Sequence, residues 1–254
     1  FHKSVDMLLG ETIYMEYENG SFTMKCTSWD DPARLRDWHD LVSAVDRMGF
    51  LPLFANRING FSVEEMTARR FWWSDEREQD PWLWRESASA SGEVVYGKFF
   101  AGKSGFVSLE WFPVYANYRR DGYDFDARWD DSLATVREKK IMDRFADRPN
   151  WIGAELKNAA GFGKNGEKNF SGVLNGLQMQ TYLVISGFRR KVSRRGAEYG
   201  MPVSVYTMPE TVWGYEKVTS AYGESASESA QKIYAHIGTL FPSAKKEEIA
   251  AALG

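Results

Sequence analysis

An α+β fold is predicted for this chain of 254 residues by three features of its sequence. Apolar residues make up 43% and charged residues 26%, which is ordinary globular composition. Stretches with apolar residues at helical spacing are interspersed with short runs of β-branched and aromatic residues. The 10 Trp, 12 Tyr and 16 Phe supply enough large rings for a sizeable core, so stability requires neither a disulfide framework nor a structural metal.

Residues 1–130 are expected to form an irregular, aromatic-rich α/β region. Two short strands are predicted over residues 11–26. A helix follows, begun by Ser28 or Asp30 and ended by Gly49, because short polar residues cap helix N-termini and glycine ends them. Aromatic and apolar runs occupy the rest of the region, at residues 71–73, 82–84, 94–100 and 106–118.

Residues 131–209 have the most regular pattern in the chain. The spacing of apolar and β-branched residues predicts three helices and then two strands, at residues 132–144, 151–160, 167–179, 182–185 and 203–207. A charged stretch, residues 189–200, joins the two strands. Three short helices followed by a hairpin with a long basic tip is the order of a winged-helix module. Residues 210–254 are expected to form a helical tail of one or two helices, broken near Pro242.

Positive charge is concentrated in this middle region. Residues 153–201 carry eight Lys and Arg against three Glu, a local charge of +5 in a chain of net charge −3. A helix-turn-helix module places its second helix in the major groove and surrounds it with cations that bind phosphates. We therefore predict binding to double-stranded DNA, through Lys164, Lys168, Asn169, Arg189, Arg190, Lys191, Arg194 and Arg195.

Two other interpretations of the basic region stay open at this point. A charge run is often only a solvated hairpin tip. A winged-helix module can also bind a protein, in which case the basic residues would contact an acidic partner. A third alternative is a small-molecule enzyme that uses an aromatic cleft in residues 70–130.

The segment YGKFFAGKSGFVSLEWFPVYANYRR, residues 96–120, resembles the part that precedes the DNA-contacting region in AlkZ/YcaQ-type DNA glycosylases. There, a Tyr-Trp-Ala-His-Ala-like stretch leads to a Pro and a Tyr-Arg-Met-like end. The following region is similar in layout, with Leu156 in its second helix and FSGVLNGL, residues 170–177, in its third. The resemblance covers about the central half of the chain. It implies DNA repair by excision of alkylated or crosslinked bases.

The chain departs from that family at two places. Gly102 stands where the family's histidine is expected, and the glutamine-containing catalytic motif of an N-terminal winged helix is not found. Gln178-Met179-Gln180 has the letters of that motif at another place, where the third helix is expected to turn into a strand. Gln178 and Gln180 are therefore catalytic candidates. The alternative is that they are ordinary polar residues at the end of the helix.

Asp121, Asp124 and Asp126 are the other weak catalytic candidates. Spaced aspartates can bind magnesium, or one can act as a general base beside a flipped base. They alternate with arginines, and such alternation more often neutralises charge in an ordered surface loop. Whether the chain is an enzyme is left open.

A phosphate-loop pattern, G-x-x-x-x-G-K-S, occurs at residues 97–104. Phe99 and Phe100 are too bulky for so tight a loop, so we interpret them as core residues and expect no cofactor, with ATP binding as the alternative.

The few metal-ligating residues predict no metal site. Cys26 is the single cysteine, and His2, His39 and His236 are far apart in the sequence. One thiol favours a reducing compartment, and no stretch approaches the roughly 18 apolar residues of a membrane span. We expect a cytoplasmic protein that does not enter the membrane.

Overall fold

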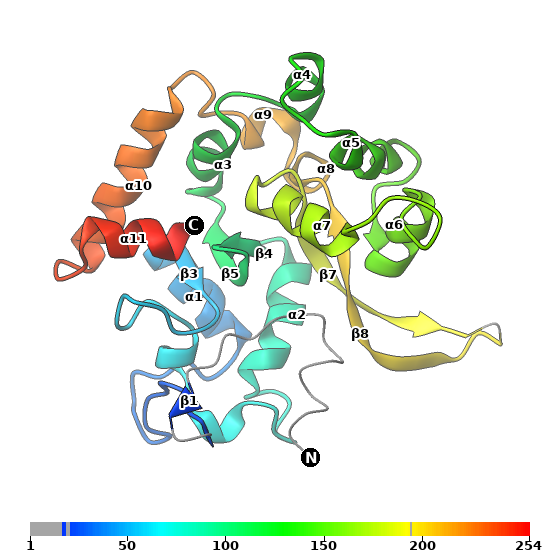
Figure 1. Ribbon diagram of the computed structural model, residues 1–254. Coiled ribbons are helices and arrows are strands. Elements are labelled where there is room, and N and C mark those ends of the chain that lie inside the picture. The colour runs from blue at the N-terminus through cyan, green and yellow to red at the C-terminus, as the bar shows by residue number, and fades with distance from the viewer. Residues whose placement is uncertain (1–16, 19–20, 194) are drawn as a thin grey trace.

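The computed structural model of the chain describes residues 17–18, 21–193 and 195–254 (Figure 1). An antiparallel sheet of six strands, in the order β3-β5-β4-β7-β8-β6, runs through the molecule. Its strands are β3 (Phe50–Pro52), β4 (Val94–Phe100), β5 (Lys103–Ser108), β6 (Trp151–Ile152), β7 (Val184–Val192) and β8 (Glu198–Thr207). The predicted combination of helices with an antiparallel sheet is confirmed. Of the two strands predicted near the N-terminus, the described residues contain the short pair β1 (Tyr17–Glu18) and β2 (Ser21–Phe22), and residues 11–16 lie outside them.

The first helix, α1 (Trp38–Met48), begins later than predicted. Its N-cap is Asp37, whose carboxylate accepts hydrogen bonds from the amides of His39 and Asp40, so the expected caps Ser28 and Asp30 were wrong. The preceding segment cannot be helical because its backbone bonds elsewhere: the Leu35 amide donates to the Met66 carbonyl at 2.9 Å. The helix ends at Gly49, with φ of 73°, as predicted.

Residues 50–130 are more regular than the sequence indicated. They contain α2 (Pro81–Ser91), α3 (Phe112–Arg120), α4 (Phe125–Asp130) and the 3-10 turns Glu64–Met66 and Arg69–Phe71, besides β3, β4 and β5. The phosphate-loop pattern lies in the β4–β5 hairpin, with Ala101 and Gly102 in the turn. A phosphate loop leads from a strand into a helix N-terminus, whereas this turn leads into a second strand, and the pattern is therefore a coincidence of letters. Phe99 and Phe100 are buried, as expected.

The middle region contains three helices and the longest hairpin of the described part of the chain. Its helices are α5 (Val136–Met142), continued by the 3-10 turn Asp143–Ala146, α6 (Gly153–Ala159) and α7 (Phe170–Met179). α5 begins after Thr135, which forms a capping box with Glu138, rather than at Ser132 as predicted. Trp151 and Ile152, predicted to be helical, pair as β6 with Val205 and Tyr206 of β8. β7 and β8 extend well beyond the two predicted runs and include most of the charged stretch between them.

The C-terminal part is helical, with α8 (Pro209–Trp213), α9 (Tyr215–Val218), α10 (Ala226–Leu240) and α11 (Lys246–Leu253). A capping box between Ser225 and Glu228 begins α10, and the two long helices are separated near Pro242, as predicted. α10 packs on α3, and the Arg119 guanidinium holds the end of the chain by donating to the Gly254 carbonyl at 2.6 Å. No helix within the described residues is long and apolar enough to cross a membrane.

Among the described residues, the buried apolar side chains form two clusters. The larger one joins α1, α2, α3, α10, α11 and the β3-β5-β4 part of the sheet, and it also takes in Val184 and Ile185 of β7. The smaller one lies among α5, α6 and α7, and includes Phe125 and Leu177. The sheet is continuous between them, because Tyr96 of β4 pairs with Ile185. The division into residues 1–130, 131–209 and 210–254 stays a proposal.

Aromatic residues of the first half fill the larger core. Trp72, Trp82 and Trp84 are at most 5% exposed, and Tyr96 and Phe106 are completely buried. These rings pack against one another and against aliphatic neighbours, so they are core residues rather than the lining of the alternative ligand cleft. Trp73, in contrast, is 41% exposed.

Candidate nucleic-acid interface

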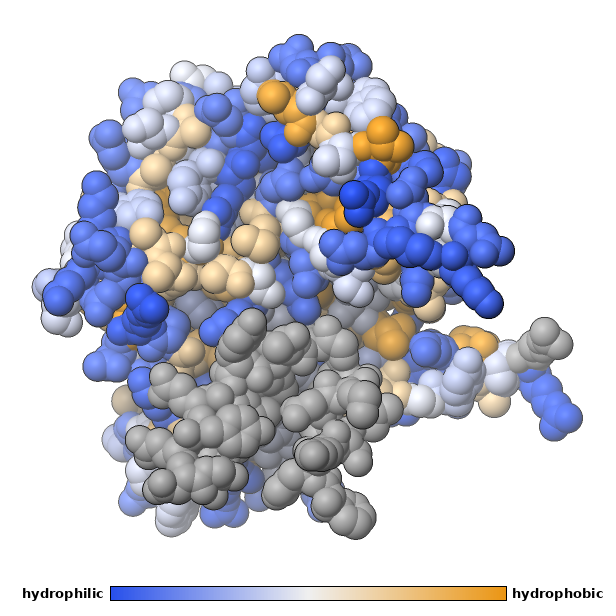
Figure 2. Space-filling model, viewed as in Figure 1, coloured by the Kyte–Doolittle hydropathy of each residue, from blue (hydrophilic) through white to orange (hydrophobic). Residues whose placement is uncertain are grey.

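The predicted DNA contacts come from two neighbouring parts of the middle region. One is the loop between α6 and α7, and the other is the β7–β8 hairpin, which projects from the body of the molecule (Figure 1). Figure 2 shows strongly hydrophilic residues gathered over α6 and the loop that follows it, while the hairpin mixes hydrophilic and hydrophobic residues. The smaller apolar cluster, which lies among α5, α6 and α7, supports the loop. β6 pairs with β8 and so connects the start of α6 to the hairpin.

The α6–α7 loop presents exposed cations at the start of α7. The Lys168 ammonium donates to the carbonyls of Gly163, at 2.8 Å, and Lys164, at 2.6 Å, and thereby closes the loop on itself. Asn169, the residue before α7, has a φ of 63° and is exposed. A hollow of about 380 Å³ lies beside these residues, lined by Lys157, Phe162, Gly163, Lys164, Glu167, Lys168, Asn169, Phe170 and Ser171. The loop therefore keeps its positive charge at the N-terminus of α7, where the helix dipole also favours an anion.

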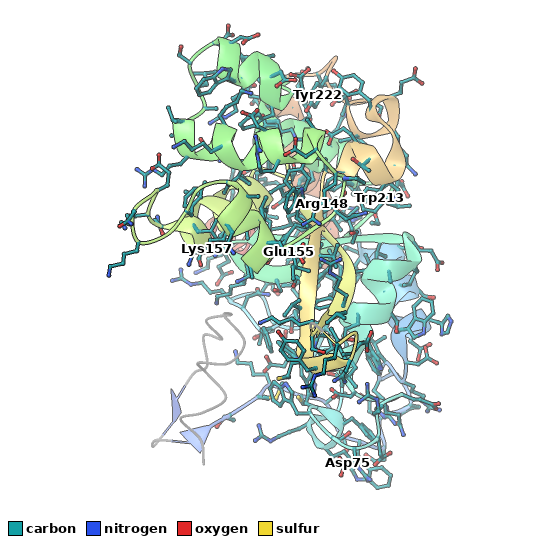
Figure 3. The ribbon with its side chains drawn as sticks, turned by 90° about the vertical axis from the view of Figure 1, so that its right-hand side faces the viewer. Asp75, Arg148, Glu155, Lys157, Trp213 and Tyr222 are labelled. Carbon is teal, nitrogen blue, oxygen red and sulfur yellow. The ribbon has the colours of Figure 1, made fainter. Side chains whose placement is uncertain are left out.

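The base of the hairpin carries an arginine that is already paired. Arg189 of β7 donates to both carboxylate oxygens of Glu155, at 3.0 and 3.1 Å, and Arg148 pairs with the same carboxylate. The Arg148 guanidinium also lies 3.6 Å from the ring centroid of Trp151. Figure 3 shows Arg148, Glu155 and Lys157 on one side of the molecule. Arg148 and Lys157 belong to this face but were not among the predicted contacts, because no charge run surrounds them that would single them out.

The outer part of the hairpin is exposed on both strands. Arg190 donates to the Gly200 carbonyl across the hairpin at 2.9 Å, and Lys191 and Arg195 extend into solvent. Arg194 lies outside the described residues. Apolar side chains accompany these cations, with Val192 62%, Tyr199 53% and Met201 52% exposed. The sequence thus located the basic hairpin, and the structure adds an exposed apolar surface to it.

Known proteins resemble this chain at the level of a family. The family model described as AlkZ related matches residues 35–254, which is most of the chain. The chain belongs to the AlkZ-related family. The resemblance found in residues 96–120 is thereby confirmed at the level of the family. No curated protein matches the chain. Among solved structures, a MarR family transcriptional regulator from Silicibacter pomeroyi is 14% identical, over 54% of this chain and 76% of the other, with a TM-score of 0.21.

Two of the three candidate aspartates of this AlkZ-related chain cap helices. Asp121 ends α3 with a φ of 52°, and Asp124 caps α4 by accepting from the Ala127 amide at 2.8 Å. Asp126 is exposed in the first turn of α4. Within residues 23–193 and 195–254, whose side chains are described, no group of three or more His, Cys, Asp or Glu is placed to hold a metal ion. Of the arginines in this stretch, Arg119 and Arg120 bond to other parts of the chain rather than to these aspartates.

The glutamines of the AlkZ-related chain are structural. Gln178 is completely buried, and its amide oxygen accepts from the Lys98 amide of β4 at 3.2 Å. Its amide nitrogen donates to the Leu174 carbonyl at 3.4 Å. Gln180 donates to the Glu138 carboxylate at 3.0 Å and so joins α7 to α5. The buried Gln178 side chain is thus bonded within the fold, and a catalytic role for either glutamine stays a prediction from the sequence.

Proposed function

We propose that residues 131–209 form a winged-helix module that binds double-stranded DNA, with α7 as the recognition helix and the β7–β8 hairpin as the wing. The chain order α5, β6, α6, α7, β7, β8 supports this proposal, as does the strand order β7-β8-β6, in which the short strand between the first two helices completes the sheet. A helix-turn-helix module directs the N-terminal residues of its second helix toward the bases. In α7 these residues, Ser171 and Gly172, are exposed.

The position of the cations is the observation that carries the proposal. The chain as a whole has a net charge of −3, yet Lys157, Lys164, Lys168, Arg190, Lys191 and Arg195 are all exposed on α6, on the loop before α7 and on the wing. A duplex presents two lines of phosphates, one on each side of the groove that a recognition helix enters. Cations on both sides of α7 would contact these phosphates, and the release of counterions would supply most of the affinity.

Anisotropy of a labelled duplex, titrated at several salt concentrations, tests the proposal. In the triple variant Arg190→Ala, Lys191→Ala, Arg195→Ala we expect weaker binding to every DNA sequence. The slope of log affinity against log salt should fall by about one for each phosphate that the variant no longer binds. The matched control is Arg36→Ala, Arg47→Ala, Arg57→Ala, which removes three exposed arginines from the other half of the chain. Equal slopes in the two triple variants would exclude the wing as a DNA contact.

The absence of salt-sensitive duplex binding by the unaltered protein, even at low salt, would overturn the DNA proposal as a whole. A basic surface without DNA affinity would then indicate an acidic protein partner, the alternative use of a winged helix.

Membership of the AlkZ-related family supports a role in DNA repair by base excision as a further part of the proposal. A duplex that contains one alkylated base, incubated with the protein and then treated with alkali, should be cut at that base. An intact strand under conditions in which the protein is bound would show binding without excision. The same duplex lacking the alkyl group is the control.

A further inference from the structure

A buried arginine joins α3 to the end of the proposed recognition helix. Arg120 is the last residue of α3, and its side chain is completely buried. Its guanidinium donates to the carbonyl of Thr181 at 2.6 Å and to the hydroxyl of Thr181 at 3.0 Å. The other edge of the guanidinium pairs with Glu210 of α8 and donates to the Tyr222 hydroxyl at 3.2 Å. Three segments that are far apart in the sequence therefore meet at one cation.

The charge of Arg120 is retained in spite of its burial. Burial alone would lower its pKa, but Glu210 and Tyr222 outweigh that effect and hold the pKa of Arg120 above its usual value. The guanidinium also lies 4.5 Å from the ring centroid of Tyr182, which adds a cation–π contact. The planar fork of arginine satisfies Thr181 and Glu210 together, which the point charge of a lysine cannot do.

Thr181 is in a conformation that needs such support. It follows α7 closely, and its φ is 63°, which is rare for a β-branched residue. Its amide donates to the Gln178 carbonyl at 2.8 Å, and the Tyr182 amide donates to the Leu177 carbonyl at 2.9 Å. These bonds make a tight turn that changes the chain direction from α7 to β7. The backbone of Thr181 thus determines the angle between the proposed recognition helix and the first strand of the wing.

We propose that Arg120 is a positioning residue for DNA binding: by holding the Thr181 turn, it orients α7 and the wing so that both meet the same duplex. This inference rests on the proposed function. Arg120 itself has no access to DNA, so its effect is transmitted through α7. Gln178 assists from the same end of α7, because it binds the Lys98 amide of β4. Two buried contacts then hold the end of α7, one to β4 of the sheet and one to α3.

The variant Arg120→Lys tests the inference in the full chain. It keeps a positive charge beside Glu210 but removes the fork that reaches Thr181. We expect duplex affinity to fall about tenfold and the salt slope to fall by about one, because a misplaced α7 or wing would lose about one phosphate contact. Arg119→Lys is the matched control, because Arg119 precedes Arg120 on α3 but bonds to the C-terminal carbonyls instead. This control should bind DNA as the unaltered protein does.

A double-mutant cycle separates positioning from general destabilisation. The decrease in affinity caused by Arg120→Lys should be less than additive with that of Lys164→Ala, Lys168→Ala beside α7, because both changes remove the same phosphate contacts. If Arg120 only stabilised the fold, Arg120→Lys would weaken all contacts with DNA alike, and the two decreases in binding free energy would be additive. Affinity and salt slope unchanged in Arg120→Lys, or additivity in the cycle, would overturn the inference.

A second variant covers the case in which Arg120→Lys does not fold. Arg120→Met combined with Glu210→Leu removes both charges of the pair, and it should show the same decrease in affinity and the same cycle. Full affinity in that folded variant would overturn the inference and leave the proposed function intact. If the unaltered protein does not bind DNA, the proposed function fails, and the inference fails with it.

Discussion

Glu155 holds two arginines of the proposed DNA-binding face. Its carboxylate pairs with Arg148 and with Arg189, and each of the three side chains is between 41 and 46% exposed. Ion pairs at this exposure contribute about 0–1 kcal/mol to stability, because water screens them and holding long side chains costs entropy. The same carboxylate, however, neutralises the positive charge of these two arginines, which would otherwise attract a phosphate. We therefore expect Glu155 to affect the proposed DNA binding more than the stability of the fold.

The variant Glu155→Gln should bind duplex DNA more tightly than the unaltered protein, because it frees two guanidinium groups. We expect the salt slope to steepen by about one for each freed arginine that reaches a phosphate. The midpoint of thermal unfolding should change little. Salt-dependent anisotropy measures the effect, with Glu247→Gln of α11 as a control for the change in net charge. Weaker binding in Glu155→Gln would show instead that the carboxylate holds its arginines in the binding conformation.

At the scale of elements, Gly105 of β5 allows the strands β3, β4 and β5 and the ring of Phe100 to lie close together. Gly105 lies opposite Pro52 of β3 and Gly97 of β4. A Cβ at this position would lie 2.4 Å from ring carbons of Phe100 and 2.9 Å from the Cα of Pro52. The backbone of β3 cannot move aside without disturbing its pairing, so the space at Gly105 is required by the sheet.

We therefore expect Gly105→Ala to lower the free energy of unfolding by about 1–3 kcal/mol, the usual cost of overpacking a core. Urea unfolding monitored by circular dichroism measures the change. Gly223→Ala is the control, because a Cβ there meets nothing within 4 Å and its φ is not in the left-handed region. An alanine at position 105 with unchanged stability would show that the Phe100 ring can repack.

The helices differ in how well local patterns predicted them. α7 was located to within a few residues, because its apolar spacing is local. α1 and α5 were predicted too early, because Ser28, Asp30 and Ser132 are as suitable for caps as the residues that act as caps, Asp37 and Thr135. β6 has only two residues, and its pairing with β8 bridges more than 50 residues of sequence, so no local pattern could reveal it.

At the scale of the whole molecule, the proposed DNA-binding module is joined to the rest by contacts of several kinds. The sheet continues from β4 to β7, Gln178 binds the Lys98 amide, and Arg120 binds Thr181. Tyr206 of β8 packs against both apolar clusters. Disruption of one cluster should therefore affect the other, although each has its own set of buried side chains.

We expect unfolding in urea to follow one cooperative transition, with tryptophan fluorescence and far-ultraviolet circular dichroism giving the same curve. Leu177→Ala, in the smaller cluster, should shift the whole curve by about 2–5 kcal/mol, since Leu177 is completely buried. Most of the buried tryptophans belong to the larger cluster, so their fluorescence reports whether it unfolds together with the smaller one. Two separate transitions would instead show that residues 131–209 unfold as an independent unit.

Local sequence was sufficient to predict the α+β fold, the basic loop and hairpin, and the family. These features depend on the spacing of apolar residues, on charge and on short motifs, all of which are patterns among neighbouring residues. The roles of Gln178 and Arg120 were decided only by the tertiary structure. The partners of Arg120 lie 61, 90 and 102 residues further along the chain, and the β4 partner of Gln178 lies 80 residues before it. A buried polar side chain must be hydrogen-bonded, and only the folded chain determines which distant groups satisfy that requirement.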